Sequence, residues 1–229
     1  MRKDKISVGD FVHVLNRGNR KQEIVRDVRD RFSFFQMLFY FNDEYSIDIP
    51  MRRIKQLVGD SALIRPDGWP PANPLVKIHA VILKENHYHM LLEEISDGGI
   101  ARFMHRIGIG MTKRFNAKYD EVGSLFQGAY KIFKLDKDGL LEYVNMYIHI
   151  KNAFEMYPGG IKNALKNFDD AYEFAIKCID SSLGVYIDGK ENHPLGEIVS
   201  TDVLGDIFEK DEKWFKKYAR EYLEETANE

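Results

Sequence analysis

The sequence of 229 residues contains a single cysteine, Cys178. This scarcity excludes a disulfide framework and a zinc site built from several cysteines. No apolar run approaches the roughly 18 residues of a membrane-spanning helix, and the opening residues MRKDKISVGD lack the apolar core of a signal peptide. These absences predict a protein of the reducing cytoplasm with no membrane partner.

Proline is also scarce, and its distribution is uneven. Four of the seven prolines lie between residues 66 and 74, which predicts a loop there. Hydrophobic residues make up 44% of the chain and charged residues 30%, an ordinary globular balance. The sequence shows no internal repeat and no low-complexity segment, so neither a solenoid nor a disordered chain is expected.

The charge is divided unequally along the chain. Residues 1–155 hold 24 Lys and Arg against 20 Asp and Glu, a net charge of +4. Residues 156–229 hold 9 against 16, a net charge of -7. A basic body is compatible with binding phosphate groups. The alternative is that the acidic tail is a solvated helical surface that says nothing about partners.

Hydrophobic periodicity predicts an α+β fold. Strands are expected at 11–16, 76–83, 87–93 and 129–135, with helices at 27–41, 100–118 and 139–150. The order β-α-β-β-α-β predicts a ferredoxin-like antiparallel sheet with helices on one face. From residue 152 the chain is expected to be mainly helical, with its clearest helices at 169–178 and 204–224 and with turns or loops at 184–194. A short helix could form earlier, at 51–58.

The tripeptide His87-Tyr88-His89 is the sharpest chemical signal. Residues i and i+2 of a strand point to the same face, so the two imidazoles lie side by side. Two such imidazoles can hold one divalent cation. The alternative interpretation is a pair of surface histidines with no ligand.

Tyr143, Tyr147 and Lys151 form a second signal, because residues four apart share one face of a helix. A tyrosine beside a cation can attack a phosphate, since positive charge favours its phenolate. The alternative is an amphipathic helix whose tyrosines pack on the sheet.

Taken together, these segments resemble a known family. The run from Ile78 to Leu92 resembles the HUH signature hairpin of single-tyrosine transposases, and Tyr147–Ile150 resembles their tyrosine helix. Residues 13–19, 103–116 and 123–128 resemble further motifs in the same order. The closest branch is the REP-associated tyrosine transposases, or IS200-like transposases. The resemblance implies a domain at 8–152, with an insertion at 45–74, and a helical C-terminal extension at 153–229.

The resemblance implies metal-dependent cleavage of single-stranded DNA and strand transfer through a 5′-phosphotyrosine. Tyr147 would be the nucleophile, and His87 and His89 would bind Mg²⁺ or Mn²⁺. The partner would be single-stranded or hairpin DNA, and a homodimer is compatible with the family. The residues expected to contact DNA are Arg17, Asn19, Arg20, Lys21, Arg114, Gln127 and Lys151.

The sequence departs from the family pattern at two positions that bear on activity. Lys151 occupies the usual position of the third metal ligand, an Asn or Gln, and Asn152 comes one residue later. On a regular helix Asn152 lies about 140° from Tyr147. Three outcomes follow: a helical bulge that brings Asn152 in as a ligand, a lysine that replaces metal charge, or impaired cleavage. Ala129 also replaces a basic residue after Gly128.

Two other functions compete with cleavage. A protein of the same fold that binds DNA without cutting it is the first, motivated by Lys151 and Ala129. A ferredoxin-like RNA-binding module is the second, and it would need exposed aromatic residues on the central strands. Those strands carry His87 and His89 instead, which argues against it.

Overall fold

The computed structural model describes residues 5–45, 63–65, 67–205 and 212–227. The short helix predicted at 51–58 and most of the insertion predicted at 45–74 lie outside the described residues. The four strands are β1 (Phe11–Arg17), β2 (Val76–Leu83), β3 (His87–Glu94) and β4 (Lys131–Lys134). The main helices are α1 (Val28–Phe41), α3 (Gly99–Tyr119), α4 (Leu140–Met146), α5 (Ala153–Glu155), α6 (Gly160–Lys166), α7 (Phe168–Lys177), α8 (Leu183–Ile187) and α10 (Glu212–Ala227).

The strands form one sheet in the order β2-β3-β1-β4. β1 pairs with β4 in antiparallel register, with Val12 opposite Lys134 and Leu15 opposite Lys131. Every second residue of β1 is buried, which is the period expected of a strand with one covered face. The element order β1, α1, β2, β3, α3, β4 and the helical C-terminal extension confirm the predicted fold class.

The chain divides into two compact units. The N-terminal unit comprises residues 1–77, 85–87 and 92–134, and the C-terminal unit comprises residues 78–84, 88–91 and 135–229. Strands β2 and β3 therefore contribute residues to both units. The domain boundary predicted at residue 152 stays a prediction.

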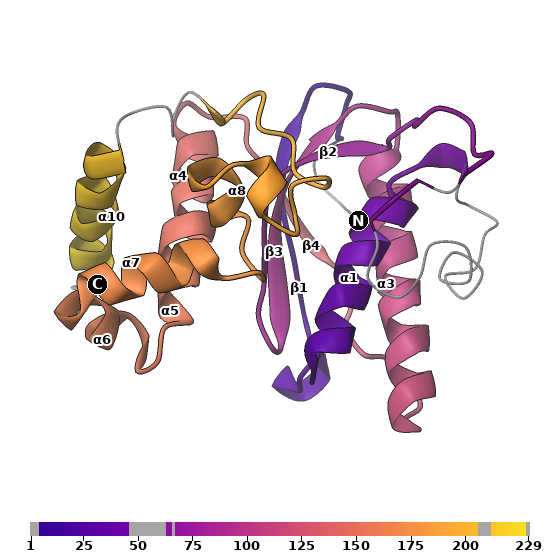
Figure 1. The fold of residues 1–229 in the computed structure, drawn as a ribbon. Coiled ribbons are helices and arrows are strands. Elements are labelled where there is room, and N and C mark those ends of the chain that lie inside the picture. Colours follow the sequence, from indigo (N-terminus) through magenta and orange to yellow (C-terminus); the bar gives the residue numbers. More distant parts are fainter. Residues whose placement is uncertain (1–4, 46–62, 66, 206–211, 228–229) are drawn as a thin grey trace. The chain divides into compact units, whose positions relative to one another are not determined.

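In the N-terminal unit, α1 begins where the side chain of Asp27 accepts a hydrogen bond from the backbone N–H of Asp30, at 3.0 Å. An aspartate at this position satisfies an N–H group that has no partner within the helix. α1 and α3 lie side by side (Figure 1), and the Arg106 guanidinium donates to the carbonyl oxygen of Phe41 at 3.0 Å. α3 starts at Gly99, where a Cβ would collide with the backbone of Leu75.

In the C-terminal unit, residues from the extension cover the outer edge of β2. Isolated bridges join Ile82 to Ser181 and Ile78 to Val199. The backbone N–H of Leu83 donates to the carbonyl oxygen of Asp180 at 2.8 Å. An uncovered edge strand would expose a row of backbone donors and acceptors, so this pairing protects β2 from other chains.

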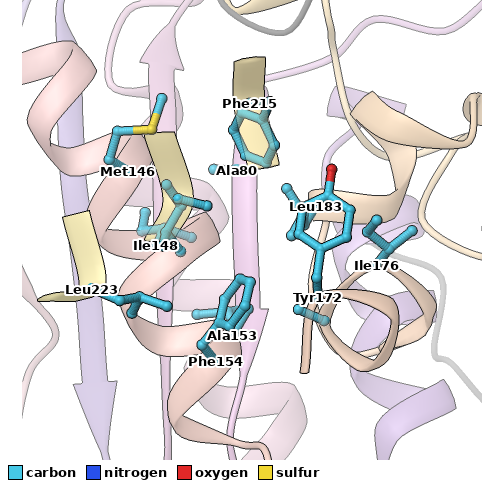
Figure 2. Close-up of a cluster of buried hydrophobic side chains, with 14 of the residues drawn as sticks. Ala80, Met146, Ile148, Ala153, Phe154, Tyr172, Ile176, Leu183, Phe215 and Leu223 are labelled. Atoms are coloured by element: carbon cyan, nitrogen blue, oxygen red, sulfur yellow. The ribbon is translucent and has the colours of Figure 1, made fainter. Parts of the chain in front are cut away.

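The core of the C-terminal unit is a large apolar cluster that joins distant parts of the sequence. Figure 2 shows Ala80 from β2 with Met146 and Ile148 from the helical segment that contains Tyr147, and with Phe215 and Leu223 from α10. All five are almost completely buried. The C-terminal extension therefore packs against the helical segment that contains Tyr147 and forms part of the same core.

One detail of the predicted secondary structure was wrong. Residues 184–194 were expected as turns or loops, but 184–187 belong to α8, and only the part that follows, with the short 3-10 turn Lys190–Asn192, fits the prediction. The helix predicted at 139–150 is present as α4 and continues as a π-helical turn, Tyr147–Asn152, which is the bulge that the sequence left open. No helix within the described ranges combines the length and apolar character that crossing a bilayer requires.

Candidate active site

β3 presents the two histidines predicted from the sequence. His87 is half-buried and its Nδ1 lies 2.6 Å from Oδ1 of Asn86. If Nδ1 carries the proton of the neutral ring, this hydrogen bond leaves Nε2 as the nitrogen that can bind a metal. A side-chain oxygen that fixes the second ring nitrogen is the usual support of a histidine ligand. His89, two residues later on the strand, is only 5% exposed.

Tyr147 lies against His89 within the C-terminal unit. The two ring centroids are 5.5 Å apart and the ring planes meet at 73°, an edge-to-face contact. Tyr147 is half-buried, whereas Tyr143, one turn earlier, is 58% exposed. The structure therefore brings Tyr147 next to a candidate metal ligand.

The π-helical turn changes which residue lies one turn after Tyr147. A π-helix closes its hydrogen bonds between residues i and i+5, so Asn152 comes round toward Tyr147. The Nδ2 of Asn152 donates to the carbonyl oxygen of Tyr147 at 2.9 Å, and the residue is 1% exposed. The sequence left open whether the helix bulges at Asn152, and the structure has this bulge. The binding of a metal by Asn152 stays a prediction.

Lys151 lies beside the nucleophile candidate and is held by an acid. Its Nζ is 5.4 Å from the ring centroid of Tyr147 and 3.2 Å from Oε2 of Glu155. The same oxygen accepts a hydrogen bond from Nζ of Lys84 at 2.7 Å. Burial raises the pKa of Glu155, but Lys84 and then Lys151 outweigh burial and lower it. The i, i+4 spacing of Lys151 and Glu155 could have revealed this pair in the sequence; Lys84 gave no such signal.

The predicted DNA-contacting loop lies in the N-terminal unit, next to the turn that leads into His87. The backbone N–H of Gly18 donates to the carbonyl oxygen of Asn86 at 2.8 Å. The Nδ2 of Asn86 donates to the carbonyl oxygen of Lys21 at 3.3 Å. One backbone bond and one side-chain bond thus fix the loop Arg17–Lys21 beside Asn86, the residue before β3. Asn19, Arg20 and Lys21 have exposed side chains.

Gln127 lies next to the loop Arg17–Lys21. Its backbone N–H donates to the carbonyl oxygen of Arg17 at 3.0 Å, and the N–H of Asn19 donates to the carbonyl oxygen of Leu125 at 2.8 Å. The side chain of Gln127 is exposed. Five of the residues predicted to contact DNA are therefore neighbours in the structure, and we call them the loop cluster: Arg17, Asn19, Arg20, Lys21 and Gln127.

Arg114 does not join this cluster. Its guanidinium lies 3.9 Å from Oδ1 of Asp30 and 3.3 Å from the carbonyl oxygen of Arg29, on the helices of the N-terminal unit. Lys118 approaches the same carboxylate at 2.6 Å. Arg114 therefore has partners inside the protein, and its proposed contact with DNA stays a prediction.

Across the described residues, no group of three or more His, Cys, Asp or Glu side chains could hold a metal ion. The metal site predicted from the sequence would therefore be held mainly by two imidazoles. His87 and His89 stay the predicted ligands, and Asn86 orients the ring of His87 as a ligand's ring is usually oriented. Since Nδ2 of Asn152 is bonded to Tyr147, its Oδ1 is the atom suited to coordination. Water or phosphate oxygens would complete the shell.

The resemblance to single-tyrosine transposases predicts a ferredoxin-like sheet, two histidines on one strand and a tyrosine near them; the structure has the sheet and brings Tyr147 against His89. The family model "Transposase IS200 like" matches residues 73–151, which span His87, His89 and Tyr147 and end at Lys151. The resemblance predicted from the sequence is confirmed over this segment, which is transposase-like. No curated protein matches the chain. A solved structure of a REP-associated tyrosine transposase bound to a REP hairpin has 12% identity, covers 82% of this chain and 84% of its own, and gives a TM-score of 0.46.

Proposed function

We propose that this protein cleaves and rejoins single-stranded DNA through a covalent phosphotyrosine, using Mg²⁺ or Mn²⁺ held by His87 and His89. The observation that carries the proposal is the edge-to-face contact of Tyr147 with His89, at 5.5 Å. It is supported by the match of residues 73–151 to a transposase family.

The reaction balances without an external energy source. The Oη of Tyr147 forms a bond to the scissile phosphorus, and the bond from phosphorus to the 3′-oxygen breaks. The phenol proton ends on that oxygen, so the products are a 5′-phosphotyrosine and a 3′-OH. Attack by another 3′-OH reverses the step and joins two strands. The covalent ester conserves the bond energy, so no ATP is required.

Each residue of the site has a role in this scheme. A bound divalent cation would supply positive charge at the scissile phosphate. The ammonium of Lys151 lies near the Tyr147 ring and would offset the negative charge that develops on the phosphate during attack. Asn152 holds the turn through the Tyr147 carbonyl oxygen, and Oδ1 of its side chain is our candidate third ligand. Arg17, Asn19, Arg20, Lys21 and Gln127 would contact the DNA strand that enters the site.

The competing function is DNA binding without cleavage. It is favoured by Lys151 at the usual ligand position and by Ala129 in place of a basic residue. In this case the loop cluster would still bind DNA, but Tyr147 would not form a covalent bond.

The two functions are separated by incubating labelled single-stranded and hairpin oligonucleotides with the protein and Mn²⁺ or Mg²⁺. Cleavage predicts a protein–DNA adduct that survives denaturing electrophoresis and is lost with a chelator. The double variant His87→Ala/His89→Ala should lose both the adduct and Mn²⁺ binding by calorimetry. His105→Ala, which removes an exposed histidine from α3, is the matched control. DNA binding with no adduct on any strand would favour the binding-only function.

A further inference from the structure

His149 lies within the π-helical turn, two residues after the nucleophile candidate, and is completely buried. Its Nδ1 is 2.6 Å from Oδ1 of Asn145, one turn earlier. Its Nε2 is 2.7 Å from Oγ of Ser182, which belongs to the C-terminal extension. Burial lowers the pKa of His149 to about 3, so the ring is neutral and has one donor and one acceptor nitrogen.

Ser182 connects this ring to strand β2. The backbone N–H of Val81 donates to Oγ of Ser182 at 2.9 Å, and the backbone N–H of Ser182 donates to the carbonyl oxygen of Val81 at 2.9 Å. Ser182 is completely buried. The Ser182 hydroxyl has two acceptors within reach, Nε2 of His149 at 2.7 Å and the carbonyl oxygen of Val81 at 3.2 Å. With its proton on the shorter bond, Val81 N–H donates to Ser182 Oγ, Ser182 O–H donates to His149 Nε2, and His149 Nδ1–H donates to Asn145 Oδ1.

A second residue of the extension contacts the same ring from another side. The rings of Tyr186 and His149 are 5.2 Å apart and meet at 68°. The hydroxyl of Tyr186 donates to the carbonyl oxygen of His79, also on β2, at 2.6 Å. The extension therefore connects the π-helical turn to β2 through two residues, Ser182 and Tyr186, and both of them contact His149.

We infer that Ser182 is a positioning residue for Tyr147. By bonding both His149 and Val81, it fixes the position of the π-helical turn relative to β2, so that Tyr147 stays against His89. This inference rests on the proposed function for its effect on DNA, but the positioning itself is a property of the folded chain. A π-helical turn is a rare conformation that persists where surrounding contacts hold it. The buried bond from Ser182 is such a contact, and Ser182 lies 35 positions beyond Tyr147 in the sequence.

The test compares Ser182→Ala with Ser181→Ala by amide hydrogen exchange in the intact chain. Ser181 is also completely buried, but its Oγ accepts a local bond from the N–H of Leu183 at 3.3 Å. We expect exchange in residues 147–152 to be about 10-fold faster in Ser182→Ala, as a net loss of one buried hydrogen bond implies, and nearly unchanged in Ser181→Ala. Ser182→Cys, which keeps the shape and weakens the bonds, should give a smaller increase at the same amides.

Activity gives a second readout. The rate of adduct formation at saturating DNA should fall about 10-fold in Ser182→Ala, with an unchanged dissociation constant for DNA, because Ser182 acts through the position of Tyr147. Unchanged exchange in residues 147–152 in Ser182→Ala, or equal effects of Ser181→Ala and Ser182→Ala, would overturn the inference. If Ser182→Ala fails to fold, Ser182→Cys decides by the same criterion. A wild-type protein that forms no adduct would refute the proposed function, while the exchange result would still decide the role of Ser182.

Discussion

The N-terminal and C-terminal units place a lysine beside a tyrosine in two different ways. In the N-terminal unit, Nζ of Lys118 is 4.9 Å from the ring of Tyr119, and the tyrosine hydroxyl donates to Oδ2 of Asp30 at 2.6 Å. Burial, followed by Asp30, raises the pKa of Tyr119. In the C-terminal unit, Lys151 approaches Tyr147, whose ring faces an imidazole.

The two pairs differ at the tyrosine hydroxyl. A hydroxyl bonded to a carboxylate is stabilised in its neutral form, so Tyr119 is a poor nucleophile. The lysines do not differ in this way, because Lys118 contacts Asp27 and Asp30 at 2.7 Å and 2.6 Å and Lys151 contacts Glu155 at 3.2 Å. A tyrosine–lysine pair in a sequence is therefore not enough to identify a candidate nucleophile; the group bonded to the tyrosine hydroxyl must also be known.

The units also differ in how they are held together. The C-terminal unit depends on an apolar cluster that reaches from β2 to α10, whereas the N-terminal unit combines an apolar core with the charged cluster of Asp30, Lys118 and Arg114. Each unit contains one of the two tryptophans, Trp69 and Trp214. Their fluorescence can report on the two units separately.

The largest effect on stability is expected from Phe215→Ala in the C-terminal unit. Phe215 is completely buried, and its ring centroid lies 6.4 Å from that of Tyr172. Removing it should lower the free energy of unfolding by about 3–5 kcal/mol through lost burial and a residual cavity. Urea unfolding of a Trp69→Phe background, followed at Trp214, measures this change. Phe133→Ala, at a site 52% exposed, is the control, and an equal loss there would contradict the packing argument.

Acid should destabilise both units, and the loss caused by the buried histidine should extend to lower pH in the C-terminal unit. Burial lowers the pKa of His149 to about 3 and that of His13 to about 4. A histidine with a lowered folded-state pKa stabilises above its unfolded pKa of about 6.5, and this stability is lost as pH falls toward the folded value. Each such group contributes a slope of up to about 1.4 kcal/mol per pH unit.

The His13 contribution therefore ends near pH 4, while that of His149 continues toward pH 3. Asp30 adds to the loss in the N-terminal unit only at lower pH. Burial raises its pKa, but the bonds from Lys118 and Tyr119 outweigh burial and lower it. Urea unfolding at several pH values, followed at Trp69 and at Trp214 in single-tryptophan variants, measures both slopes. If the free energy of unfolding followed at Trp214 does not change between pH 6 and pH 4, the assignment of His149 as a buried neutral ring is refuted.

The smallest effect is expected from the loop cations of the N-terminal unit. Arg20→Ala/Lys21→Ala should weaken single-stranded DNA binding by about 10-fold at low salt and reduce the slope of log affinity against log salt by about 1.4. Both side chains are exposed, so stability should not change. Fluorescence anisotropy at several salt concentrations measures the effect. Lys217→Ala, which removes an exposed cation from α10, is the control, and an equal loss of affinity there would show that the loop has no special role.

Much of the fold follows from local sequence patterns. The alternation of β1, the buried run of β2 and the aspartate that begins α1 were all predicted close to their observed bounds. The order of motifs also indicated His87, His89 and Tyr147 as a group. These features depend on periodicity and on residues close to each other in the chain, and both can be found in a single sequence.

The features that could not be predicted depend on distant contacts. The sequence named a helical bulge at Asn152 as one of three outcomes, but it could not choose among them, because packing from distant parts of the chain decides whether the extra residue is accommodated. The bond between His149 and Ser182 joins residues 33 positions apart. The ion pair of Arg114 with Asp30 likewise joins residues far apart in the sequence.

The position of the nucleophile is the central claim, and one comparison of variants tests it most directly. Wild type, Tyr147→Phe and Tyr143→Phe are incubated with a labelled hairpin-bearing single strand and Mn²⁺, and covalent adduct and DNA affinity are both measured. Tyr147→Phe should lose the adduct and keep DNA affinity, while Tyr143→Phe, at a site 58% exposed, should retain both. An adduct that survives Tyr147→Phe but disappears in Tyr143→Phe would contradict the account.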